Sequence, residues 1–217
     1  MQIFKLAKTN CGWRNIQYPT TCRSYLKELQ RRSKFKNFFN NLVIDLKNKK
    51  IPKSIEDSSD IVSYRTNGLV KYSGKYHNYC IKMSIEMTPE YIPISYSLDE
   101  GTASDSSILD KMLNERAKLP YRIYLDKGYE KYDRRRILRR RNCQVKIEMK
   151  KTNNNRKRAP RFSFSRENRK QRGEIEKFYA WLKSFMILRL NRQRVKSLFH
   201  GIFLIVLSYF AFRKLKL

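Results

Sequence analysis

The sequence predicts an α/β domain, a mixed sheet flanked by helices, preceded by a short basic helical segment. Stretches rich in β-branched and aromatic residues, typical of strands, are concentrated between residues 53 and 98 and recur at 122–126 and 144–149. Segments with apolar residues at helical spacing alternate with the later strands and close the chain. Hydrophobic residues make up 41% of the 217 residues, enough for a core, which argues against a wholly disordered basic tail.

The N-terminal segment, residues 1–50, is basic and mostly polar. Within it, residues 23–47 carry apolar side chains at near-helical spacing, so we expect one or two amphipathic helices. Residues 48–52 have the composition of a linker. We therefore divide the chain into a helical segment, 1–50, and one larger domain, 51–217.

The larger domain is expected to begin with strands separated by Gly68, Gly74 and Pro89. These strands are predicted at residues 61–64, 69–72, 79–87 and 91–98. A helix over 106–119 follows, because its apolar residues have helical spacing and Pro120 closes it.

The C-terminal half is expected to alternate strands and helices before a basic loop and two helices. The segments are a strand at 122–126, a helix at 132–141, a strand at 144–149, a basic loop at 150–172, a long helix at about 169–191 and an apolar helix at 198–212. The last run has about 15 residues, short of the roughly 20 that span a membrane, so we expect a buried helix and no membrane association.

Charge is the most unusual feature of the composition. The chain has 49 Lys and Arg against 19 Asp and Glu, and residues 127–217 alone hold 28 basic and 6 acidic side chains, a net charge of +22. Such an excess favours a polyanionic partner, and nucleic acid is the commonest one. The four cysteines include no Cys-x-x-Cys pair, which argues against a zinc site and is typical of free thiols in a reducing cytosol.

Three acidic residues stand out as candidates for catalysis. Asp57 lies at the onset of the first strands, Asp126 ends a predicted strand before a glycine turn, and Glu176 lies on the long helix. Taken singly, the aspartates could be loop or turn residues, and Glu176 could form a surface pair with Arg172. Together, two or three carboxylates are a ligand set for Mg²⁺ or Mn²⁺, and two such ions can promote phosphodiester displacement.

The predicted long helix has a broad apolar face and a polar stripe beside it. On the apolar face lie Ile175, Phe178, Leu182, Phe185 and Met186. The stripe consists of Arg172, Glu176, Ala180 and Lys183, so one carboxylate lies between two cations where the helix would meet the sheet.

At these same residues the sequence resembles the DDE transposases of insertion-sequence families four and five. Residues 125–129 (LDKGY) are similar to the D-[KR]-G-Y strand end of that family, and residues 172–185 (RGEIEKFYAWLKSF) to its R-x3-E-x6-K helix. Residues 57–59 (DSS) resemble the first-acid motif D-[ST]-[ST], and residues 73–77 and 104–106 resemble intervening elements. The likeness extends over roughly 53–212.

The resemblance implies an RNase H-like fold whose catalytic triad, Asp57, Asp126 and Glu176, holds Mg²⁺ or Mn²⁺. Asp60 is the alternative first acid. The DNA contacts implied by the resemblance are Arg172 and Lys183 at the element end and the basic positions Arg189 and Arg192. Arg169 stands where part of the family has tyrosine, so a stacking role is not expected there, and we count it as a DNA-contacting residue.

The function implied is that of a transposase, which cleaves DNA at the ends of an insertion sequence and transfers the strands to target DNA. The expected partners are double-stranded DNA and further copies of the chain, as a homo-oligomer in the DNA complex. The expected location is the prokaryotic cytoplasm, at the nucleoid when bound to DNA. Two alternatives stay open: a truncated or inactive derivative that only binds DNA, possible because residues 1–50 are short for a DNA-binding region, and a basic RNA-binding protein, which composition alone supports.

Overall fold

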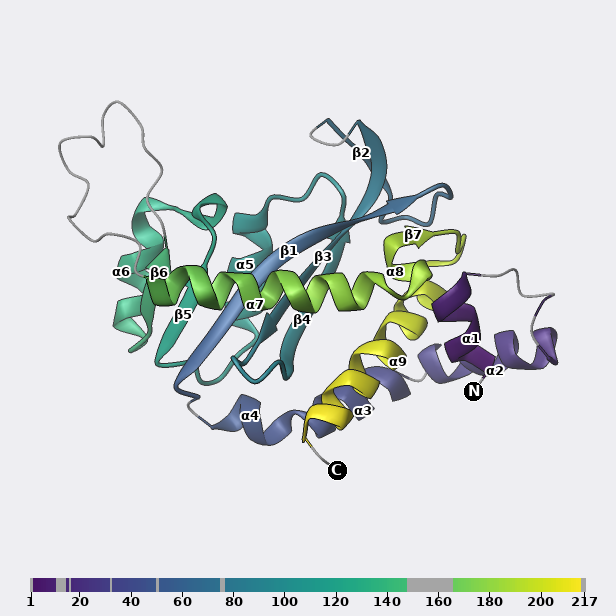
Figure 1. The fold of residues 1–217 in the computed structure, drawn as a ribbon, viewed down its shortest axis with the longest axis horizontal. Helices are drawn as coiled ribbons and strands as arrows, with labels where there is room; N and C mark the ends of the chain where they lie inside the picture. The colour runs from purple at the N-terminus through teal and green to yellow at the C-terminus, as the bar shows by residue number, and fades with distance from the viewer. Residues whose placement is uncertain are drawn as a thin grey trace.

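The computed structural model describes residues 2–10, 15, 17–31, 33–49, 51–74, 77–147 and 166–215. A long central sheet carries helices on both faces, and both ends of the chain lie on the same side of the molecule (Figure 1). The elements in chain order are α1 (Gln2–Thr9), α2 (Pro19–Arg31), α3 (Lys34–Leu42), α4 (Ile44–Asn48), β1 (Lys53–Ser63), β2 (Lys71–Ser73), β3 (Asn78–Met87), β4 (Pro93–Glu100), α5 (Asp105–Asn114), β5 (Arg122–Leu125), the 3-10 turn η2 (Lys127–Tyr129), α6 (Tyr132–Arg140), β6 (Gln144–Ile147), α7 (Arg166–Lys183), α8 (Met186–Arg189), β7 (Leu190–Asn191) and α9 (Lys196–Leu215).

The sheet is mixed and is organised around β1. On one side β1 pairs antiparallel with β3, which pairs antiparallel with β4 and β2. On the other side β1 runs parallel to β5, and β5 runs parallel to β6. The short β7 also lies parallel to the end of β1. The predicted fold class, an α/β mixed sheet flanked by helices, is confirmed.

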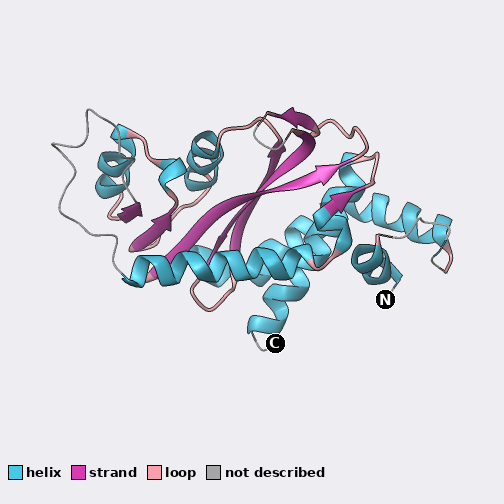
Figure 2. Cartoon of the chain, turned by 45° about the horizontal axis from the view of Figure 1, so that its top comes forward, coloured by secondary structure: helices cyan, strands magenta, loops and turns pink. Residues whose placement is uncertain are grey.

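Each face of the sheet has its own hydrophobic cluster, and Figure 2 shows the long helix α7 lying along one of these faces. On that face, side chains of β1 and β3 pack with α7, α9 and the N-terminal helices; examples are Ile55, Ile85 and Phe178. On the other face, α5 and α6 cover β5 through residues such as Leu109 and Leu138. The sheet is therefore covered on both faces where the parallel strands lie, as parallel sheets require.

The first strand is longer than predicted. A strand was expected at 61–64, but β1 begins at Lys53 and pairs with β3 from Ile55 to Val62. The polar residues in the middle of β1 hid this strand, because tertiary pairing outweighs local preference there. Asp57 consequently lies in the middle of a strand and not at its onset.

The long helix is shorter than predicted. A helix was expected to continue to residue 191, but α7 ends at Lys183 and Phe185 is extended, with φ −78° and ψ 108°. After the short helix α8, Leu190 and Asn191 are extended because they pair with Val62 and Ser63 at the end of β1. Met186, expected on the apolar face, is therefore exposed, whereas Phe185 is buried as expected. Most of the predicted basic loop, residues 150–165, and the strand end at 148–149 lie outside the described residues.

Four helices, α1 to α4, precede the sheet; α2 and α3 pack against α9, α1 packs against α8 and α9, and α4 contacts α3. Leu6, Leu26 and Phe39 are fully buried in the same cluster as Phe203 of α9. By length and composition α9 could cross a membrane, yet 61% of its most apolar window is buried inside the protein. The division of the chain at residue 50 stays a prediction.

A chain of hydrogen bonds through His200 joins the N-terminal helices to the sheet. Nε2 of the Gln30 amide in α2 lies 3.1 Å from Nδ1 of His200 in α9. Nε2 of His200 lies 2.9 Å from the hydroxyl of Tyr96 in β4. Burial lowers the pKa of His200, and with the positive charges of Lys36 and Lys196, which lower it further, the pKa is about 4.

We expect this histidine to make folding sensitive to acid. Its pKa is lower in the folded than in the unfolded chain, so its contribution to stability is complete above about pH 6.5 and is lost as the pH falls towards about 4. The loss is on the order of 3 kcal/mol. The free energy of unfolding, measured with urea at several pH values, should fall less for His200→Gln than for the wild type as the pH is lowered. Replacing the exposed His77 by Asn is the control, and it should leave the fall unchanged. An equal fall in the free energy of unfolding for His200→Gln and the wild type would contradict the prediction.

Candidate active site

Asp57 is held at the centre of the sheet by α7. Its backbone carbonyl accepts a hydrogen bond of 2.6 Å from the hydroxyl of Tyr179. Its own carboxylate accepts a hydrogen bond of 2.8 Å from the backbone N–H of Ser58. Burial raises the pKa of Asp57, the Ser58 bond opposes this rise and the negative charge of Asp126 adds to it, and the net pKa is about 6.

Asp126 lies beside Asp57 because of the parallel pairing of β1 and β5. The last paired residues are Ile55 and Tyr124, and each aspartate lies two residues further along its own strand. Adjacent strands are about 4.8 Å apart, so this register places the two acids side by side. Asp126 also precedes the turn η2, as the glycine after it predicts.

Arg172 of α7 supplies a positive charge to this pair. Nη2 of Arg172 lies 2.9 Å from Oδ1 of Asp126, and both side chains are 29% exposed. The same guanidinium also acts on Asp57, whose pKa it lowers against the stronger effect of burial. The sequence predicted a contact between this arginine and DNA, whereas in the free protein its partner is a candidate catalytic acid.

A third acid near the pair, Asp105, was not predicted as a site residue. It accepts hydrogen bonds from the hydroxyl of Ser58 at 2.5 Å and from the ammonium of Lys82 at 2.9 Å. A Cβ added to Gly128 would lie 3.7 Å from both Oδ2 of Asp105 and Oδ2 of Asp126, so the two carboxylates flank this glycine. The only signal in the sequence was the match of residues 104–106 to an intervening family element.

Glu176 lies on the part of α7 that crosses β1 and β5, between Arg172 and Tyr179, the two residues that contact the aspartates. Its side chain is exposed, and no hydrogen bond or ion pair joins it to Asp57 or Asp126. Across the described ranges, no three His, Cys, Asp or Glu side chains lie close enough together to hold a metal ion. The structure thus brings the two aspartates together and leaves Glu176 at the rim.

The other predicted residues lie further out. Lys183 is half-buried, and burial lowers its pKa while the charge of Asp60, the alternative first acid, raises it. Oδ1 of Asp60 accepts a weak hydrogen bond of 3.6 Å from the Cys80 thiol. The remaining predicted DNA contacts are all exposed, and they are Arg169, Arg189 and Arg192.

The donor set at the two aspartates fits a divalent cation. Carboxylate oxygens are the ligands preferred by Mg²⁺ and Mn²⁺. Burial and, to a smaller extent, the negative charge of Asp126 disfavour ionisation of Asp57, and a cation held by these carboxylates would oppose both effects. Oδ1 of Asp126 is buried and has Arg172 as its close cationic neighbour, so positive charge is already required at this position.

Behind Asp57, the opposite face of the sheet carries a second buried carboxyl, Glu56. Its Oε1 accepts a hydrogen bond of 3.1 Å from the hydroxyl of Tyr129, the last residue of the turn after Asp126. Burial raises the pKa of Glu56 well above its usual range, and the charge of Asp57 raises it further. Its cross-strand partner Glu86 forms a buried ion pair with Arg116. This layer therefore supports the turn that carries Asp126.

Three comparisons relate the chain to known proteins. A family model described as "Transposase DDE domain" matches residues 41–211. A search of curated proteins gives no match. Among solved structures, the chain is similar to "Crystal structure of the Mos1 Strand Transfer Complex", with 14% identity and a TM-score of 0.29. That match covers 85% of this chain and 62% of the other, so the present chain spans less than two thirds of that protein's length.

Glu56 gives a prediction for the layer beneath the site. Because its pKa is raised in the folded state, its contribution to stability is present below about pH 4.5 and is lost as the pH rises. Glu56→Gln keeps an oxygen acceptor for Tyr129 and removes the titration. We expect the variant to melt at a higher temperature than the wild type at pH 8, with about 2–4 °C for each kcal/mol gained. Glu90→Gln, at an exposed position, is the control. If the melting temperature of Glu56→Gln changed with pH as that of the wild type does, the raised pKa of Glu56 would be refuted.

Proposed function

Because the chain belongs to the family of transposases with a DDE domain, we propose that it cuts DNA at the ends of an insertion sequence and joins the freed 3′-hydroxyl to target DNA. The observation that carries the proposal is the pair Asp57 and Asp126, set side by side by strands β1 and β5 under helix α7. Paired carboxylates in a strongly basic protein suit a phosphodiester substrate better than a small neutral one.

We propose that Asp57, Asp126 and Glu176 hold the metal, Mg²⁺ or Mn²⁺. When bound, such an ion supplies Lewis-acid stabilisation of charge on the phosphate oxygens. Tyr179 positions Asp57 by bonding its backbone carbonyl, and Arg172 balances the charge of Asp126 until DNA is bound. Glu176 follows Arg172 by one helical turn, so a small adjustment of α7 would bring its carboxylate towards the same place.

The basic residues of α7, of α8 and of the segment after β7 are proposed to bind the element end. Arg172 would exchange its contact with Asp126 for a DNA phosphate, and Lys183 would contact the backbone nearby. The exposed residues Arg169, Arg189 and Arg192 would extend this contact. We further propose that residues 1–50 assist in binding DNA, that the chain acts as a homo-oligomer in the DNA complex, and that it works in the prokaryotic cytoplasm at the nucleoid.

A second function is favoured by one specific observation. Within the described residues Glu176 does not meet the two aspartates, and Arg172 occupies the position beside Asp126. A transposase derivative that binds DNA without cutting it would have the same arrangement. The experiments below separate this DNA-binding derivative from the enzyme.

The acidic residues should control cleavage and not binding. We expect Asp126→Asn and Glu176→Gln, which keep the side-chain shape and remove the charge, to lower Mg²⁺- or Mn²⁺-dependent cleavage of end-bearing DNA by orders of magnitude. Binding of the same DNA should persist or tighten, since a negative charge near phosphate is lost. Cleavage would be measured on gels and binding by fluorescence anisotropy.

Lys183→Ala is the matched control, because it should weaken binding to the element end and leave the acids in place. Wild-type protein that binds its own element's ends but never cuts them would favour the DNA-binding derivative. Variants at Asp126 and Glu176 that cut as well as wild type would refute the proposed triad.

Binding to DNA should depend steeply on salt. Residues 127–217 have a net charge of +22, and each phosphate that is neutralised contributes about −0.9 to the slope of log affinity against log salt concentration. Anisotropy titrations with one duplex at several salt concentrations would measure this slope. A nearly flat affinity between low and physiological salt would contradict the proposed electrostatic binding.

A further inference from the structure

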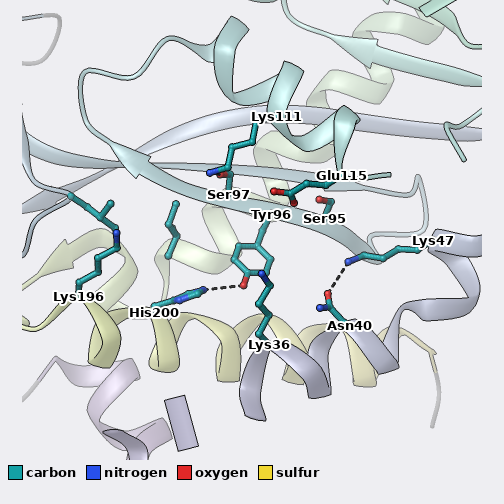
Figure 3. Close-up of a pocket in the computed structure, with 12 residues that line it drawn as sticks. Lys36, Asn40, Lys47, Ser95, Tyr96, Ser97, Lys111, Glu115, Lys196 and His200 are labelled. Carbon is teal, nitrogen blue, oxygen red and sulfur yellow. Dashed lines mark hydrogen bonds between the residues drawn. The ribbon is translucent and has the colours of Figure 1, made fainter. Parts of the chain in front are cut away.

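A pocket lined by lysines lies at the edge of the sheet, apart from the residues of the candidate active site (Figure 3). Its volume is about 190 Å³, and helices α3, α4, α5 and α9 surround it together with strand β4. Four of its side chains are lysines, each from a different helix: Lys36, Lys47, Lys111 and Lys196. The only acidic side chain among the residues that line it is Glu115.

The pocket follows the outer edge of β4. Among the described strands β4 pairs only with β3, so its other edge borders the pocket. In Figure 3, Tyr96 lies between Lys111, Ser97 and Glu115 on one side and Lys36 and His200 on the other. Both faces of the strand therefore contribute polar side chains to the same cavity.

The positive charges in the pocket act on one another. Burial lowers the pKa of Lys47, and the charges of Arg116 and Lys36 lower it further, against the opposing charge of Glu115. The low pKa of His200 likewise has Lys36 and Lys196 among its causes, after burial. Positive charges therefore lie close together around the cavity, and a bound anion would relieve their repulsion.

The protein itself neutralises these lysines only in part. Nζ of Lys111 pairs with Asp99 at 3.3 Å, and Nζ of Lys47 donates to the neutral amide oxygen of Asn40 at 2.8 Å. Lys36 and Lys196 are exposed and form no ion pair with another described residue. The pocket thus keeps positive charge that is available to a ligand.

The chemistry of the lining fits a phosphate group. Ammonium groups from several directions, with the neutral donors Tyr96, Ser95 and Asn40 nearby, suit an anion with several acceptor oxygens. The volume is below the roughly 300–1,000 Å³ of pockets that enclose whole drug-sized ligands, so there is room for one phosphate and little beyond it. We infer that this pocket binds a phosphate group, at a site separate from the proposed catalytic acids.

The phosphate could arrive on a nucleic-acid backbone or as a free ion. Asp57, Ile85 and Tyr96 lie on one rung of the sheet, because Asp57 pairs with Ile85 and Ile85 pairs with Tyr96. Two strand spacings separate the backbones of Asp57 and Tyr96, a distance of about 10 Å. A DNA strand near the sheet is therefore one possible source, and the test below distinguishes it from inorganic phosphate.

The test measures how fast each lysine reacts with an acetylating reagent, read by mass spectrometry. The full chain is used without metal, in chloride, acetate or inorganic phosphate at equal ionic strength, and with a random-sequence duplex that lacks element ends. A bound ligand slows the reaction by a factor of 1 + [L]/Kd, so about threefold at twice Kd. We expect slowing at the pocket lysines and not at the exposed Lys5 and Lys118, which lie outside the pocket.

Matched double variants locate the effect. In the variant Lys36→Gln/Lys196→Gln, the ligand should no longer slow acetylation of Lys47 and Lys111. The control Lys5→Gln/Lys118→Gln removes the same amount of charge, and in it the slowing at Lys47 and Lys111 should persist. Slowing by inorganic phosphate alone identifies free phosphate as the ligand, and stronger slowing by the duplex identifies a DNA phosphate; both support the pocket. The inference would be overturned if acetate slowed the pocket lysines as much as phosphate did, if the control lysines were slowed as much as the pocket lysines, or if no ligand slowed the pocket lysines. Because no cleavage is measured, the result is independent of the proposed transposase activity.

Discussion

Two contacts made by helix α7 organise the candidate active site. The hydroxyl of Tyr179 fixes the backbone at Asp57, and the guanidinium of Arg172 meets the carboxylate of Asp126. These residues are seven apart, two turns of the helix, so they lie on one side of α7 and reach two neighbouring strands. The position of Glu176, the approach of α7 to the sheet and the charge balance of the aspartates all depend on this docking.

Both faces of the sheet beneath the site carry hydrophobic clusters. The α7 face also holds the two aspartates, while the α5 face also holds Glu56 and the buried ion pair of Glu86 with Arg116. Removing one member of a buried pair leaves an uncompensated charge and is costly, so this polar layer is constrained as a unit. Because Tyr129 connects Glu56 to the turn after Asp126, that constraint also reaches the candidate catalytic acid at the end of β5.

Positive charge serves two places in this fold. At α7, Arg172 offsets the charge of acids that are proposed to bind metal, and DNA would compete for it. At the edge of β4, lysines from four helices converge where Glu115 is the acidic residue of the lining and Asp99 pairs with Lys111. A protein with a net charge of +30 repels itself in the absence of polyanions, and gathering charge at defined sites turns that repulsion into affinity for phosphate.

The sequence by itself determined the α/β class and most strands and helices, because these depend on local periodicity and spacing. For the same reason it placed Asp126 at the end of a strand and Glu176 on a helix. Only the tertiary structure decided that β1 begins at Lys53 and that α7 ends at Lys183, because pairing with β3 and β7 overrides local preference. It alone also brought Asp105 to the aspartates and assembled the lysine pocket. The lysines that line that pocket are at positions 36, 47, 111 and 196, and chain folding, which no spacing in the sequence records, brings them together.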